Sequence, residues 1–198
     1  MIYIRDYSAP QVNEAEILRY AGADRNCEEL RPLLLDCLDE IGDRLTYKVC
    51  YSQFDIAFHG NEIDFGFARV SSKDLAKNLS GCKSIIVFAA TVGIEIDRLI
   101  ARYSSRSPAR ALMVQAIGNE RIEALCNVFC KEMAKEREAE QELVRPRFSA
   151  GYGDLPLELQ RHIFAVLDCP RKIGVTLNQS LLMSPSKSVT AIIGISHK

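Results

Sequence analysis

The sequence predicts an α+β fold in which a single domain, residues 1–198, holds an antiparallel or mixed β-sheet with helices packed around a buried central strand. That strand is residues 83–91, a nearly continuous apolar run of the kind that is buried on both faces. β-rich segments precede it, and apolar residues at helical spacing lie on both sides of it. With no internal repeat and no linker, this mixture indicates one α+β domain.

The first third of the chain is expected to contain helices followed by β-rich segments. These elements are predicted at residues 13–20, 25–44, 46–52, 54–59 and 63–70. Pro32 predicts that the second helix begins near this residue or is kinked there. Residues 59–62 have the composition of a hairpin turn. We expect the hairpin strands to share a sheet with the central strand.

The rest of the chain is dominated by helices. A short helix, three longer helices and a pair of C-terminal strands are predicted at 71–81, 94–103, 108–140, 157–167 and around 184–187. Ser71 or Ser72 is placed to cap the short helix, and Pro108 to begin the longest one. The far end of that helix, residues 131–142, carries charges on all sides, so we expect it to project into solvent.

Composition excludes several classes of function. The net charge of −1 gives no electrostatic basis for binding nucleic acid or an anionic membrane. No apolar run approaches the roughly 20 residues of a membrane span, and the first residues lack the layout of a signal peptide. We therefore expect a cytoplasmic protein. Seven scattered cysteines without a Cys-x-x-Cys pair are expected to be buried thiols, and three distant histidines predict no metal site.

The loop at residues 145–156 has the composition of a small-molecule site. It combines a guanidinium, two glycines, a phenol and a carboxylate: Arg147, Gly151, Tyr152, Gly153 and Asp154. An arginine fork recognises a carboxylate, glycines allow close backbone approach, and an aromatic ring can stack on a base. Such a loop suits a zwitterion that carries an aromatic base. On the residues alone, an ordinary connection between two helices remains an alternative, and Arg145 competes with Arg147.

Glu123 interrupts an apolar stripe of the long helix. Leu112, Ala116, Glu123 and Cys130 are separated by four, seven and seven residues, so they share one face. A carboxylate in such surroundings needs a partner. That partner is either a ligand or a structural arginine.

Several ordered motifs carry a resemblance to a known family. Arg147-x-x-x-Gly151-Tyr152, followed by Asp154-Leu-Pro156, resembles the S-adenosylmethionine loop of the activation domain of cobalamin-dependent methionine synthase. Further similarity lies in residues 85–93, 121–124, 172–177, 180–185 and 188–190. Together these segments span roughly residues 83 to 195.

The resemblance implies roles for particular residues. Arg147 would hold the methionine carboxylate of S-adenosylmethionine, and Glu123 its ammonium or its ribose hydroxyls. Ser149 and Gly151 would offer backbone groups to the adenine or ribose. Tyr152 would contact the ligand or the cobalamin face, with an aromatic anchor that packs the loop as the alternative. No residue is assigned acid–base catalysis, because the sulfonium already activates the methyl group and the protein needs only to orient it.

The resemblance also implies partners. A stand-alone chain of this kind would reactivate a cobalamin-dependent methionine synthase by positioning the methyl donor for reductive methylation of cob(II)alamin. Cobalamin would come only through the partner protein, and the electron from a flavodoxin or ferredoxin. The alternative is a non-catalytic S-adenosylmethionine sensor or a docking module for another corrinoid protein. A ligand-contacting tyrosine that the family carries beyond the last strand, and an acidic residue near its N-terminus, have no evident counterpart here, so we expect weaker affinity.

Overall fold

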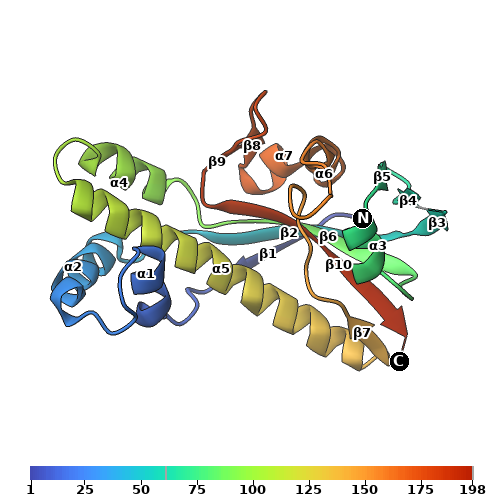
Figure 1. Ribbon diagram of the computed structural model, residues 1–198, viewed down its shortest axis with the longest axis horizontal. Coiled ribbons are helices and arrows are strands. Elements are labelled where there is room, and N and C mark those ends of the chain that lie inside the picture. Colours follow the sequence, from blue (N-terminus) through green and yellow to red (C-terminus); the bar gives the residue numbers. More distant parts are fainter. Residues whose placement is uncertain (61, 198) are drawn as a thin grey trace.

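The computed structural model describes residues 1–60 and 62–197 and shows a mixed α+β domain (Figure 1). Its elements are β1 (Tyr3–Tyr7), α1 (Glu14–Tyr20), the 3-10 helix η1 (Glu28–Leu30), α2 (Arg31–Ile41), β2 (Tyr47–Asp55), β3 (Ala57–His59), β4 (Glu62–Asp64), β5 (Arg69–Ser71), α3 (Lys73–Asn78), β6 (Ser84–Thr91), α4 (Glu95–Tyr103), α5 (Pro108–Glu138), β7 (Glu142–Val144), α6 (Leu159–Leu167), α7 (Cys169–Ile173), β8 (Thr176–Leu177), β9 (Met183–Ser184) and β10 (Ser188–His197). The predicted fold class is confirmed.

The main sheet has the strand order β1-β2-β6-β10-β7, and every neighbouring pair is antiparallel. β6 lies at its centre, with Ser84 opposite Asp55 of β2 on one side and Ile195 of β10 on the other. Every residue of β6 is buried, as its unbroken apolar composition predicts. The central strand is therefore confirmed.

Two helical layers cover the two faces of this sheet (Figure 1). Successive side chains of a strand point to opposite faces. Ile86 and Phe88 accordingly pack into a core with α1, α2, α4 and α5. Ile85 and Val87 pack into a second core with α3, α6 and α7. The long helix α5 thus lies on one side of the sheet and α6 on the other.

The helix boundaries agree with the local sequence signals. α2 begins at Arg31 with Pro32 in its first turn, α5 begins at Pro108, and the Ser72 hydroxyl accepts a hydrogen bond from the Leu75 N–H to cap α3. α7 was not predicted.

The hairpin strands do not share the main sheet. β3, β4 and β5 form a separate three-stranded sheet, and of the β-rich segments in the first third only β2 joins β6. All three residues of β3 are exposed, so this strand has no apolar face to add to the central core. The predicted turn includes residue 61, which lies outside the described residues.

The far end of α5 packs against the domain and does not project into solvent. Met133 is almost fully buried there. Arg5 of β1 pairs with Glu132 and Glu136, and the Arg137 Nη2 donates to the Gln53 Oε1 at 2.9 Å. Most residues of this end are exposed, but the prediction was wrong for one face, because β1, β2 and β7 supply partners for its charges.

The segment after β7 runs along the outer edge of β10. The Arg145 N–H donates to the Gly194 carbonyl at 2.8 Å. Phe148 and Ile192 then exchange two hydrogen bonds of 2.8 Å. Beyond Phe148 the loop leaves the strand, and this departure creates the site described below. None of the helices among the described residues is long and apolar enough to cross a bilayer.

Candidate functional site

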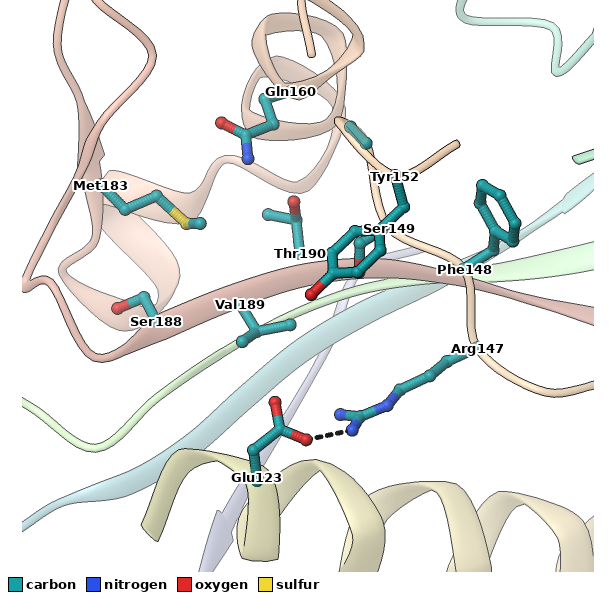
Figure 2. A pocket seen from close by; sticks show the side chains of 11 residues that line it. Glu123, Arg147, Phe148, Ser149, Tyr152, Gln160, Met183, Ser188, Val189 and Thr190 are labelled. Carbon is teal, nitrogen blue, oxygen red and sulfur yellow. Dashed lines mark hydrogen bonds and ion pairs between the residues drawn. The ribbon is translucent and has the colours of Figure 1, made fainter. Parts of the chain in front are cut away.

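A pocket of about 360 Å³ opens where the loop departs from β10 (Figure 2). Helix α5 contributes one wall, β9 with the first residues of β10 a second wall, and α6 and the loop the remaining sides. It is lined by Glu123, Arg147, Phe148, Ser149, Ala150, Tyr152, Gln160, Met183, Ser188, Val189 and Thr190. The pocket therefore draws on elements that are far apart in the sequence.

An ion pair forms the charged end of the pocket. The Arg147 Nη2 contacts the Glu123 Oε2, and the side chains remain 26% and 37% exposed. The other terminal nitrogen of the guanidinium, Nη1, is buried and has no hydrogen-bond partner. Burial lowers the pKa of Arg147, but neighbouring groups that include Glu123 outweigh this and leave the pKa raised. Arg147 therefore stays positively charged and keeps a donor free.

Two unpaired acceptors belong to residues that line the same pocket. The Gln160 Oε1 and the Thr190 Oγ1 are buried without a partner, and both residues line the pocket. With Arg147, they account for three of the six such side-chain atoms in the part of the chain that the structure describes. Buried polar atoms are usually satisfied, so their concentration here marks a place where a polar ligand would be stabilised.

Apolar and aromatic groups complete the lining. Phe148, Met183 and Val189 contribute the apolar surface. Tyr152 is 70% exposed, and Figure 2 shows its ring over the mouth of the pocket with the hydroxyl directed toward Val189. That exposure argues against an aromatic anchor packed inside the loop. The ring is available to a ligand or to a second protein.

Two predicted residues of the loop differ in their placement. Ser149 lines the pocket, whereas Gly151 does not. The Gly151 N–H already donates to the Leu155 carbonyl at 3.0 Å, and the residue has a φ of +87°. Any contribution of Gly151 to binding therefore acts through the shape of the turn, because glycine adopts this conformation at little cost.

The structure separates Arg147 from Arg145. Arg145 does not line this pocket, and its Nη2 donates to the Ser80 carbonyl at 3.0 Å. Only Arg147 joins the candidate site.

Asp154 anchors the loop from outside the pocket. Its carboxylate accepts hydrogen bonds from the Ser72 hydroxyl, the Lys73 N–H at 2.7 Å and the Asp74 N–H at 3.2 Å. The carboxylate therefore caps the N-terminus of α3 and not that of α6, the helix that follows it in the chain. The Ser72 hydrogen bond, followed by that of the Lys73 N–H, lowers the pKa of Asp154.

Sequence reasoning did not assign seven of the lining residues to the site: Phe148, Ala150, Gln160, Met183, Ser188, Val189 and Thr190. Two signals were available. Ser188 and Thr190 place hydroxyls on one face of an otherwise apolar strand, and Gln160 is a polar residue on the buried face of α6. Neither signal shows by itself that the two elements meet.

The cysteines contribute no recognised site. All seven are free, and five are buried as expected: Cys37, Cys50, Cys82, Cys126 and Cys169. Burial raises the pKa of Cys126 to about 12, which keeps this thiol beneath the ion pair protonated. Among the described residues, no group of three or more metal-ligating side chains converges.

The fold and the pocket define an α+β domain with a small charged site at a sheet edge. Residues 66–198 match the family described as "Vitamin B12 dependent methionine synthase, activation domain", and the chain belongs to this family. The family resemblance stated from the motifs is thereby confirmed.

Known structures support the fold over nearly the whole chain. The chain is similar to the "Crystal Structure of the MetH Reactivation Domain bound to AdoHcy", with a TM-score of 0.71 and 18% sequence identity. The similarity covers 98% of this chain and 78% of the other. A comparison with curated protein sequences found no match.

We expect Asp154→Asn to lower stability at neutral pH. The folded-state pKa of Asp154 is lowered. Its hydrogen bonds to the N-terminus of α3 therefore stabilise the folded protein above the unfolded-state pKa of about 3.9. This contribution is lost as the pH falls through the folded-state pKa. The difference in urea midpoint between wild type and variant should be present at pH 7 and shrink below about pH 4. Asp39→Asn, at an exposed carboxylate of α2, is the control; an equal effect there would contradict the assignment.

Proposed function

We propose that this chain binds S-adenosylmethionine in the pocket and presents it as the methyl donor that reactivates a cobalamin-dependent methionine synthase. One observation carries the proposal: a buried Arg147 nitrogen without a partner lies beside Glu123 in a pocket that also holds two unpaired acceptors. Membership in the activation-domain family supports it. So does the AdoHcy bound by the structural relative.

The residues present fit the chemistry of S-adenosylmethionine. Arg147 would donate hydrogen bonds to the carboxylate of the methionine part, and Glu123 would accept them from the ammonium or the ribose hydroxyls. The unpaired acceptors of Gln160 and Thr190 suit hydroxyl or amino donors. Ser149 would offer backbone groups near the base. Each charged or polar part of the ligand therefore has a complementary group in the pocket.

The pocket also offers contacts for the aromatic adenine base of the ligand. Phe148 and Met183 offer apolar contacts, and Tyr152 offers an aromatic face at the mouth. Because Tyr152 is exposed, the same ring could meet the corrin face of a docked partner.

The role of this chain is to bind and orient. When bound, the ligand supplies a methyl group that its sulfonium has already activated. The side chains need only hold the donor toward the open mouth, and no residue is required as a general acid or base. One electron from a flavodoxin or ferredoxin would complete the reductive methylation of the cofactor on the partner.

Cobalamin is assigned to the partner and not to this chain. Cobalamin domains of methionine synthases carry an Asp-x-His-x-x-Gly motif, and none of the histidines at 59, 162 and 197 has an aspartate two residues before it. Contact with the partner must be transient, because its catalytic domains need the same cofactor during turnover.

Arg147→Ala is expected to weaken S-adenosylmethionine binding strongly. Loss of a charge-assisted pair to a carboxylate costs about 1.5–3 kcal/mol, which is roughly tenfold or more in affinity. Isothermal titration calorimetry measures this directly. Arg145→Ala is the matched control and should have a much smaller effect, because that side chain is outside the pocket. Equal losses, or no binding by the wild type, would reject the assignment.

Glu123→Gln should reduce affinity with little change in the thermal midpoint. Both members of the ion pair are partly exposed, and pairs of this kind contribute little to stability. Affinity by calorimetry and the midpoint by thermal denaturation separate the two roles. A large fall in the midpoint with unchanged affinity would show that the pair serves the fold.

The chain should accelerate methylcobalamin formation on a partner. A cob(II)alamin-loaded methionine synthase without its activation domain would be mixed with a reductant and S-adenosylmethionine, and the cobalt spectrum followed. Methylcobalamin should appear only when this chain is added, and the Arg147→Ala variant should slow its formation. Tight uptake of cobalamin by the chain alone, or no acceleration, would contradict the proposal.

A further inference from the structure

Lys187 is a buried cation next to the pocket that the proposed chemistry does not use. It lies between β9 and β10 and is only 5% exposed. Its Nζ donates to the Asn119 Oδ1 of α5 at 2.8 Å, and it forms no salt bridge with a described carboxylate. Burial lowers the pKa of Lys187, and the charge of Asp97 offsets only part of this. An ammonium without a close counter-ion costs stability, so this placement calls for a reason.

The side chain of Lys187 packs against α5 at Gly118. A Cβ on Gly118 would lie 2.8 Å from the Lys187 Cε and 2.9 Å from its Cγ. The lysine stem therefore crosses the helix directly over this glycine. A glycine inside a helix is unfavourable by roughly 0.5–1 kcal/mol relative to alanine. Here the absence of a side chain leaves room for the lysine stem and for Ile96, whose Cγ2 would also lie 2.8 Å from such a Cβ.

The segment around Lys187 carries one wall of the pocket. Met183 precedes it, and Ser188 and Thr190 follow it. The Lys187 carbonyl accepts a hydrogen bond from the Val92 N–H at 3.1 Å. Its side chain, by contrast, reaches the opposite wall. One residue thus spans the distance between strand and helix.

The helix end of this span lies close to the charged end of the pocket. Asn119 and Glu123 are four residues apart on α5, so they are neighbours on one face of the helix. The bond from Lys187 to Asn119 therefore ties the turn before β10 to the helical turn that presents Glu123. Movement of the turn would change the separation of the two walls.

We propose that Lys187, seated over Gly118 and held by Asn119, is a positioning residue that fixes the β9–β10 wall relative to Glu123 and so sets the affinity of the pocket. This inference rests on the proposed function for its ligand. The hydrogen bond from Lys187 to Asn119 should also slow hydrogen exchange in residues 183–190, and this can be measured without ligand.

Three variants test the inference. Lys187→Met keeps an unbranched side chain and removes the ammonium, Asn119→Ala removes the acceptor, and Asn119→Asp keeps an acceptor for Lys187. Lys83→Met, at an exposed lysine before β6, is the matched control. Each protein would be measured by calorimetry with S-adenosylmethionine, by thermal denaturation and by hydrogen exchange of the backbone in residues 183–190.

Lys187→Met and Asn119→Ala should weaken binding by roughly fivefold or more and speed exchange in residues 183–190. Asn119→Asp and Lys83→Met should remain close to wild type. The thermal midpoint of Lys187→Met should not fall, because a buried charge without a carboxylate partner is removed. Affinity loss in Asn119→Asp equal to that in Asn119→Ala would overturn the inference, as would a lowered midpoint with unchanged affinity.

The exchange measurement separates this inference from the proposed function. If the wild type does not bind S-adenosylmethionine, the proposed ligand is wrong, and exchange alone decides whether Lys187 holds the wall. Unchanged exchange in both Lys187→Met and Asn119→Ala overturns the inference whether or not binding is seen. If Lys187→Met does not fold, Asn119→Ala decides.

Discussion

The outer edge of β10 is paired along only part of its length, and the candidate site depends on this constraint. β7 pairs with residues 195–197, and Phe148 exchanges hydrogen bonds with Ile192. Toward residue 188 the loop turns away from the strand. An exposed strand edge presents unpaired backbone groups, and natural proteins cover such edges or use them. Here the uncovered stretch becomes part of one wall of a pocket, and the last pairing residue, Phe148, is next to Arg147 in the chain.

The loop that leaves β10 keeps its shape through contacts with α3. Asp154 accepts three hydrogen bonds at the N-terminus of that helix, one from the Ser72 hydroxyl and two from backbone N–H groups that would otherwise be unsatisfied. Gly153, with a φ of +54°, lies against Asp74, where a side chain could not be accommodated. Ordering the loop in this way before a ligand arrives reduces the entropy that binding would otherwise cost.

The Arg147–Glu123 pair leaves the charged end of the pocket electrically balanced and still able to form hydrogen bonds. Each side chain neutralises the other while the pocket is open, and each has remaining hydrogen-bonding capacity. Partial exposure keeps the energy of the pair small, so a zwitterion can satisfy the carboxylate and the guanidinium at little cost to stability. The pair is supported from below by α5 and from the side by the turn that contains Lys187.

The sequence by itself determined the features that depend on neighbouring residues. Three such features are the apolar run of β6, Pro108 at the start of α5 and the composition of the loop with Arg147. Hydrophobic periodicity and turn-forming residues predict features of this kind directly. Glu123 was found because it interrupts a helical stripe. Only the tertiary structure shows which distant groups meet: Glu123 with Arg147, Asp154 with α3 rather than α6, and Lys187 with Gly118. It also brings Gln160 and Thr190 to one pocket. These pairings depend on how β10, α5 and α6 pack around one sheet, and the short strands β1 and β7 form only because that sheet offers edges to pair with.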